Sequence, residues 1–125
     1  MKLFILLAIL SIFILAASDC NQEKKGVTKY KGRLEIKGIC FNYTIKLLEG
    51  AIDSSQISNY WVDESTGKSY ANVFKLNNPC SFPATINAGD EFYFIIDSSA
   101  PKECIVCEAY YPTPFRSLQI KVLGK

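Results

Sequence analysis

The chain has 125 residues, a formal net charge of +2 and no histidine. The missing histidine excludes Ser-His-Asp and Cys-His catalysis, zinc proteases that use two histidines, and blue-copper ligation. The net charge is small and the basic residues are dispersed among acidic ones, which does not favour nucleic-acid binding. We therefore predict a protein that is not an enzyme, needs no metal or cofactor, and does not bind nucleic acid.

The first eighteen residues have the pattern of a secretory signal peptide. Lys2 precedes an apolar run over residues 3–15, in which Ser11 is the one polar residue, and small residues follow at 16–18. A positive start, an apolar segment of about 7–15 residues and a small-residue exit are typical of an export signal. The run is shorter than the roughly 20 residues that a membrane-spanning helix needs. We expect residues 1–18 to direct export, and the protein to lie in the periplasm or cell envelope.

Residues 19–29 form a polar tether that contains Cys20. Two hypotheses fit this segment: cleavage after the small residues leaves Cys20 as a thiol or disulfide, or Cys20 is lipidated and anchors the protein to a membrane. Asp19 departs from the small residue that normally precedes a lipidated cysteine. The cysteine count of five agrees with lipidation, because four cysteines then remain for disulfides. Both hypotheses stay open.

After Gly26, apolar and polar residues alternate with a period of two, and β-branched and aromatic residues are frequent. We predict strands at residues 31–37, 40–46, 59–63, 68–74, 91–97, 103–111 and 117–123. A short helical turn is expected to begin at Asp53 or Ser54, and residues 65–67 form a hairpin turn. Six or seven strands at this spacing predict an all-β fold, a single antiparallel sandwich or small barrel, in one domain over residues 30–125.

The motif Cys104-Ile-Val-Cys107 has three interpretations. A thiol–disulfide oxidoreductase places such a pair at a helix N-terminus, and neither the strand pattern nor Glu108 favours this. A zinc site needs two close pairs, and Cys40 and Cys80 stand alone. In a strand, the Cα atoms of Cys104 and Cys107 lie about 10 Å apart at ~3.3 Å per residue. A disulfide spans no more than about 7 Å, so each must bond to Cys40 or Cys80.

Two pairings satisfy this geometry. We favour Cys40–Cys107 with Cys80–Cys104, because Cys80 and Cys104 both lie where a loop leads into a strand. Secreted domains commonly use such disulfides for stability.

Two aromatic pairs stand out, Tyr60-Trp61 and Tyr110-Tyr111. In a strand, one member of each adjacent pair faces solvent, where it can contact a protein or a carbohydrate. The alternative is that these side chains cover the open end of a barrel.

Residues 38–43, 78–83 with 89–92, and 104–114 together resemble small uncharacterised exported β-proteins of the Bacteroidota type, which often carry lipoprotein-like leaders. This resemblance spans most of the mature chain and implies an envelope location, but no activity. Residues 85–92 are similar to the start of a strand in cupredoxin-like sandwiches, whose copper ligands are missing here.

The segment Ser65-Thr-Gly-Lys-Ser-Tyr70 resembles the serine–glycine–tyrosine loop of membrane-bound lysozyme inhibitors, which are small disulfide-bonded β-barrels. The resemblance implies that Ser65 and Lys68 contact the acidic site of a host or competitor lysozyme. We therefore predict a non-catalytic binding or structural module with a protein or carbohydrate partner. Lysozyme inhibition and thiol–disulfide exchange through Cys104 and Cys107 are the alternatives.

Overall fold

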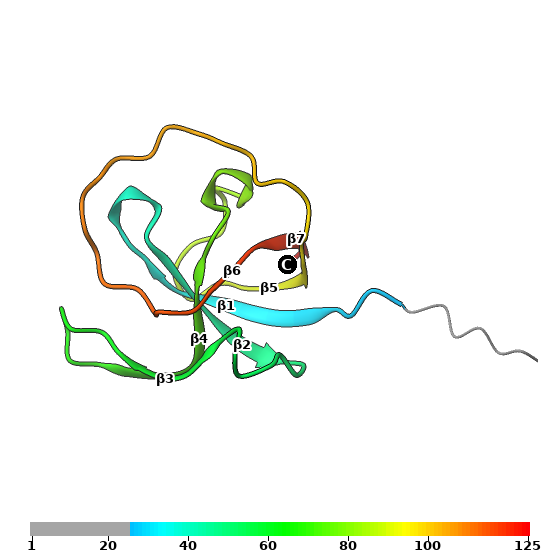
Figure 1. The fold of residues 1–125 in the computed structure, drawn as a ribbon, viewed down its shortest axis with the longest axis horizontal. Coiled ribbons are helices and arrows are strands. Elements are labelled where there is room, and N and C mark those ends of the chain that lie inside the picture. Colours follow the sequence, from blue (N-terminus) through cyan, green and yellow to red (C-terminus); the bar gives the residue numbers. More distant parts are fainter. Residues whose placement is uncertain (1–25) are drawn as a thin grey trace, which may run out of the picture.

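The computed structural model describes residues 26–125 (Figure 1). The strands are β1 (Tyr30–Lys37), β2 (Tyr43–Glu49), β3 (Ser58–Val62), β4 (Ser69–Leu76), β5 (Glu91–Ile96), β6 (Ser117–Leu118) and β7 (Ile120–Gly124). Two short 3-10 turns accompany them, η2 (Ile39–Phe41) and η3 (Pro79–Ser81). The predicted all-β fold is confirmed. The proposed signal peptide and Cys20 lie outside the described residues.

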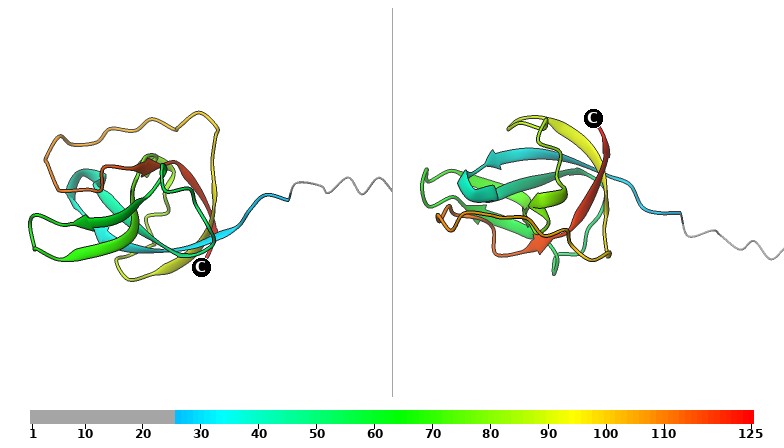
Figure 2. Two further views of the ribbon diagram at one scale, coloured as in Figure 1. Left: turned by 60° about the horizontal axis from the view of Figure 1, so that its bottom comes forward. Right: turned by 90° about the horizontal axis from the view of Figure 1, so that it is seen from above.

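All seven strands belong to one sheet, in the order β3-β4-β2-β1-β5-β7. Neighbours on this path are antiparallel, whereas β6 pairs in parallel with β4 through Lys75↔Ser117 and Leu76↔Leu118. One residue after β6 the chain enters β7, which pairs with β5. The sheet is therefore curled on itself, as the views in Figure 2 show, but it is not closed into a barrel.

The core lies inside this curl and is built from alternate residues of the strands. Leu34 of β1, Ile45 of β2 and Phe74 of β4 are fully buried, as is Phe94 of β5. Gly32 allows β1 to approach these rings, because a Cβ there would lie 3.0 Å from Phe94 Cε1. The alternation of apolar and polar residues that predicted the strands therefore also determines which side chains face the core.

The strand predicted at 103–111 does not form, which corrects the sequence analysis. Residues 98–115, here called the strap, connect β5 to β6 and contain no strand. No backbone–backbone hydrogen bond involves any of these residues. Pro101, Pro112 and Pro114 have no N–H group to donate, and disulfides draw the middle of the strap towards η2 and η3. The strap runs along the outside of the domain (Figure 1).

Three smaller predictions also need correction. The second strand begins three residues late, because Cys40 and Phe41 have left-handed φ angles of 53° and 60°. The helical turn expected from Asp53 is only a hydrogen-bonded turn, in which Ser55 N donates to Asp53 Oδ1 at 2.8 Å. The last predicted strand is interrupted at Gln119, which separates β6 from β7.

Candidate binding site at a strap held by two disulfides

Two disulfides attach the strap to the body of the domain. Cys107 bonds to Cys40 in η2, with a Cα–Cα distance of 4.9 Å. Cys104 bonds to Cys80 in η3, with a Cα–Cα distance of 5.6 Å. These are the two pairs that the sequence favoured, although the strap is not the strand from which they were argued. Cys104 and Cys107 therefore hold two separate turns and are not bonded to each other.

Polar contacts fix the strap on either side of the disulfides. Gln119 Nε2 donates to the Ser99 carbonyl at 2.6 Å, near the start of the strap. Asn42 Nδ2 donates to the Ala109 carbonyl at 3.1 Å, beside the Cys40–Cys107 bond. The strap is thus held by side chains and sulfur atoms in place of a strand ladder.

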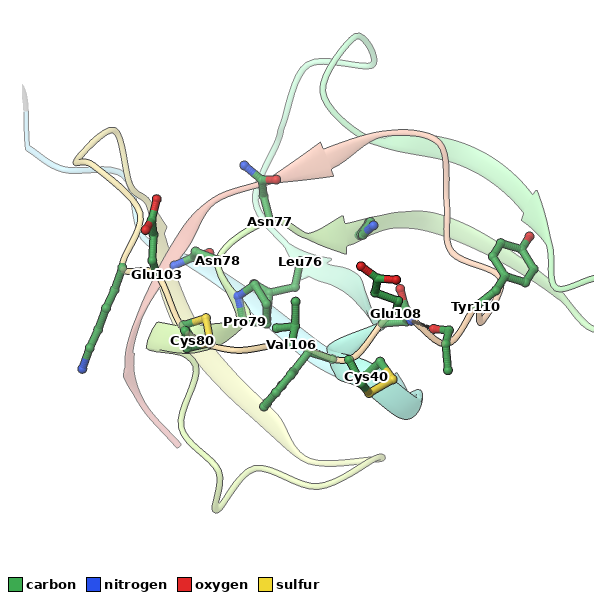
Figure 3. Close-up of a pocket in the computed structure, with 17 residues that line it drawn as sticks. Cys40, Leu76, Asn77, Asn78, Pro79, Cys80, Glu103, Val106, Glu108 and Tyr110 are labelled. Atoms are coloured by element: carbon green, nitrogen blue, oxygen red, sulfur yellow. Dashed lines mark hydrogen bonds between the residues drawn. A yellow bond between two sulfur atoms is a disulfide. The ribbon is translucent and has the colours of Figure 1, made fainter.

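A cavity of about 580 Å³ lies between the strap and the body (Figure 3). Its walls come from η2 and Asn42, from the segment Lys75–Cys80, and from strap residues between 102 and 110. Val106 lies between the two disulfides in this view, whereas Ile105 is not part of the lining. Every residue from 98 to 110 is exposed, so this part of the strap stands away from the core, whereas Pro112 and Pro114 are buried.

The strap and the neighbouring η2 carry most of the exposed large hydrophobic side chains. Ten large hydrophobic side chains are exposed in the described part of the chain, and six of them lie on the strap or on η2. We call these six the strap surface: Ile39, Phe41, Ile105, Val106, Tyr110 and Phe115. Ile105 is 99% exposed and Phe115 is 90% exposed. Exposed apolar side chains that gather in this way commonly mark an interaction site.

Asp63 connects the end of the strap to the β3–β4 hairpin. Its carboxylate is buried and accepts hydrogen bonds from Ser65 N at 2.9 Å and Ser65 Oγ at 2.7 Å. Tyr111 of the strap donates to the same carboxylate at 3.4 Å. Burial raises the pKa of Asp63, but the hydrogen bonds from Ser65, Thr66 and Tyr111 together outweigh it and hold the pKa below its ordinary value.

No role for Asp63 was predicted from the sequence, although a local signal was present. An aspartate that begins a turn often accepts a hydrogen bond from the backbone two residues later. Asp63 stands two residues before Ser65, so this local pattern was visible. The bond to Tyr111 was not, because it joins residues 48 positions apart.

The six residues predicted as a binding surface divide into three groups. Tyr60 and Lys68 line a shallow concavity on the sheet, far from the strap in sequence. Trp61 stacks on Tyr70, with ring centroids 5.6 Å apart. The remaining three lie at or near the strap: Tyr110 lines the cavity, and Ser65 and Tyr111 bond to Asp63.

Residues 26–125 contain no group of three or more Cys, Asp and Glu side chains that could hold a metal ion. Among the same residues, no helical segment has the length and hydrophobicity of a transmembrane helix. In comparisons with known proteins, no family model, no curated protein and no solved structure matched the chain. The function is therefore argued from the geometry and chemistry of these sites.

Proposed function

We propose that the protein is an exported, non-catalytic binding module whose strap surface contacts a protein partner. The observation that carries this proposal is that six of the ten exposed large hydrophobic side chains of the described residues lie on the strap or on η2, which the Cys40–Cys107 disulfide joins. Disulfides in a small β-domain are typical of an oxidising, extracytoplasmic compartment, which supports export.

The disulfides also give the strap a property useful for recognition. A loop that is ordered before binding loses less conformational entropy when its partner docks. Ile105 lies between Cys104 and Cys107, so its position is restricted on both sides. An aliphatic side chain that protrudes from such a loop suits an apolar pocket on a protein, and interfaces are commonly centred on anchors of this kind.

The two alternatives from the sequence receive different support. A thiol–disulfide oxidoreductase would bond Cys104 to Cys107, and this pairing is absent, so the geometry does not favour it. Lysozyme inhibition stays a prediction: Ser65 and Lys68 are exposed on the β3–β4 hairpin, although the Ser65 hydroxyl already donates to Asp63.

The proposal is tested by photo-crosslinking in the cells that produce the protein. A photoreactive amino acid at Tyr110, which is 79% exposed, should give a discrete adduct with one protein. When Ile105→Asp is added to the chain that carries the photoreactive residue at position 110, the adduct should be lost. A carboxylate cannot enter an apolar pocket without a large desolvation cost. A photoreactive group at Leu123, an exposed apolar position on β7, serves as the matched control and should give none.

Three outcomes contradict the proposal. They are no adduct from position 110, an adduct that survives Ile105→Asp, or an equal adduct from position 123.

A further inference from the structure

A second concavity, of about 320 Å³, lies on the outer face of the sheet and shares no residue with the strap cavity. Arg33 and Glu35 of β1 alternate with the buried Leu34, so they face away from the core. Lys46 of β2 likewise follows the buried Ile45. The remaining lining residues are Tyr60 of β3, Lys68 just before β4, and residues 69–71 at the start of β4.

The lining of this concavity has an excess of positive charge. It contains three cations, Arg33, Lys46 and Lys68, and one carboxylate, Glu35. Arg33 Nε donates to Glu35 Oε1 at 2.7 Å, so one cation is neutralised. Neither lysine forms an ion pair within the described residues.

The strand register leaves the positive charge of Lys46 without a carboxylate partner. Arg33 and Lys46 are direct partners across β1 and β2. Arg33 is compensated by Glu35 and lies opposite Glu91 of β5, whereas Lys46 lies between Arg33 and Val73 and has no acidic partner across the strands. The two unpaired ammonium groups therefore point to a ligand that carries negative charge.

Aromatic rings border the charged groups. Tyr60 is 71% exposed, so its ring is available to a ligand. Tyr70 is held in place by the stacked Trp61, and Lys68 Nζ lies 5.0 Å from the centre of the Tyr70 ring. An exposed ring beside cationic and hydroxyl groups suits a ligand with both an apolar face and acidic groups. A sugar acid in its ring form has both.

We propose that this concavity binds an acidic carbohydrate, with carboxylate or sulfate groups against Lys46 and Lys68 and a sugar ring against Tyr60. The volume is at the lower end of the range for small-ligand sites, which fits a short segment of a polysaccharide. A nucleic acid fits less well, because its binding usually rests on a longer series of phosphate contacts than two free lysines provide.

The test is calorimetric titration of the folded domain with polygalacturonate, dextran sulfate, neutral dextran and a single-stranded DNA oligomer, all at physiological ionic strength. At least one acidic polysaccharide should bind, and neutral dextran and DNA should not. Polygalacturonate and dextran sulfate distinguish carboxylate from sulfate recognition. The double variant Lys46→Gln, Lys68→Gln should weaken binding at least tenfold through loss of two charge-assisted contacts.

Tyr60→Ala should weaken binding severalfold, and because this side chain is exposed the variant is expected to fold. The matched control Lys29→Gln, Lys121→Gln removes two charges outside the concavity and should leave the affinity within twofold.

The proposal is overturned if the acidic polysaccharides bind no better than neutral dextran, or if DNA binds as well as they do. It is also overturned if the control weakens binding as much as the double variant. None of these outcomes bears on the strap, because the two sites share no residue.

Discussion

Two buried polar side chains, Thr44 and Asn78, differ in what their polar atoms contact. Thr44 is fully buried, and its Oγ1 atom has no hydrogen-bond partner among the described residues. Asn78 is also buried, but both ends of its amide are used. Its Nδ2 donates to the Ile120 carbonyl at 2.7 Å, and its Oδ1 accepts from Ile120 N at 2.9 Å. The side chain of Asn78 thus replaces a strand neighbour at the start of β7.

Thr44→Val should stabilise the domain. Valine has nearly the same shape as threonine and removes a hydroxyl whose burial without a partner costs about 1–3 kcal/mol. We expect the free energy of unfolding to rise by about 1 kcal/mol in urea denaturation. Thr44→Ser keeps the hydroxyl and loses the methyl group, so it should destabilise. A valine variant less stable than the wild type would show that the hydroxyl has a partner.

Asn78→Ala should destabilise the domain strongly. The substitution leaves the N–H and carbonyl groups of Ile120 without partners in a buried position, at a cost of about 2–4 kcal/mol in unfolding free energy. The neighbouring side chain of Asn77 is exposed, so Asn77→Ala serves as the control and should change stability by less than about 0.5 kcal/mol. Equal effects of the two substitutions in urea denaturation would contradict this role for Asn78.

Asp63 should make stability depend on acidic pH. Its folded pKa lies below the ordinary value, because hydrogen bonds from Ser65, Thr66 and Tyr111 outweigh the effect of burial. The unfolded chain therefore binds this proton more tightly than the folded domain does. The resulting stability is fully present above the unfolded pKa of about 3.9 and is lost as the pH falls through the lower folded pKa.

The comparison that isolates this effect is the difference in unfolding free energy between the wild type and Asp63→Asn across pH 2–7. We expect the difference to be largest above about pH 5 and to shrink as the pH falls below about 4. Glu64→Gln removes an adjacent exposed carboxylate and should not reproduce that profile. A difference independent of pH would mean that the charge of Asp63 does not stabilise the fold.

At the scale of elements, the sequence encodes the hairpins better than it encodes the strap. Alternation around Leu34 and Ile45, together with the left-handed Gly67 between β3 and β4, is local information, and the predicted hairpins form. Residues 103–111 carry an equally strand-like composition. Their conformation is decided by bonds to Cys40 and Cys80, which no local pattern reveals.

The same limit applies to the candidate sites. Tyr60 was predicted from the adjacent aromatic pair Tyr60-Trp61, and Lys68 from the resemblance of residues 65–70 to the loop of lysozyme inhibitors. Arg33 and Lys46 looked like ordinary outward-facing strand residues. Only the register of β1 against β2 places them opposite each other and beside Tyr60.

Removing the two disulfides separately should reveal unequal contributions to stability. The Cys40–Cys107 bond closes 67 residues and the Cys80–Cys104 bond closes 24. Loop-closure entropy then gives about 4 kcal/mol for the longer loop and about 3.5 kcal/mol for the shorter one. We expect Cys40→Ser, Cys107→Ser to lower the unfolding free energy more than Cys80→Ser, Cys104→Ser does. The reverse order in urea denaturation would show that native contacts of the strap, and not chain entropy, dominate.

For the whole molecule, the curled sheet presents two separated surfaces. The strap surface is apolar and is attached through η2 and η3, whereas the concavity around Tyr60 is basic and belongs to the sheet itself. Because the two surfaces share no residue, each proposed ligand would contact its own set of side chains. This arrangement depends on the strap, which lies in place only if its two cysteines bond to separate turns.

The claim that Cys104 and Cys107 bond to separate turns is tested most directly by disulfide mapping of the protein isolated from its producing cells. Trypsin cleaves after Lys37, Lys46, Lys75, Lys102 and Arg116, so residues 38–46, 76–102 and 103–116 become separate peptides. Without reduction, the account predicts one species of three linked peptides, and fragmentation between Ile105 and Val106 should leave Cys104 with Cys80 and Cys107 with Cys40. Recovery of 103–116 as a single peptide, lighter by two hydrogens and bonded only to itself, would contradict it.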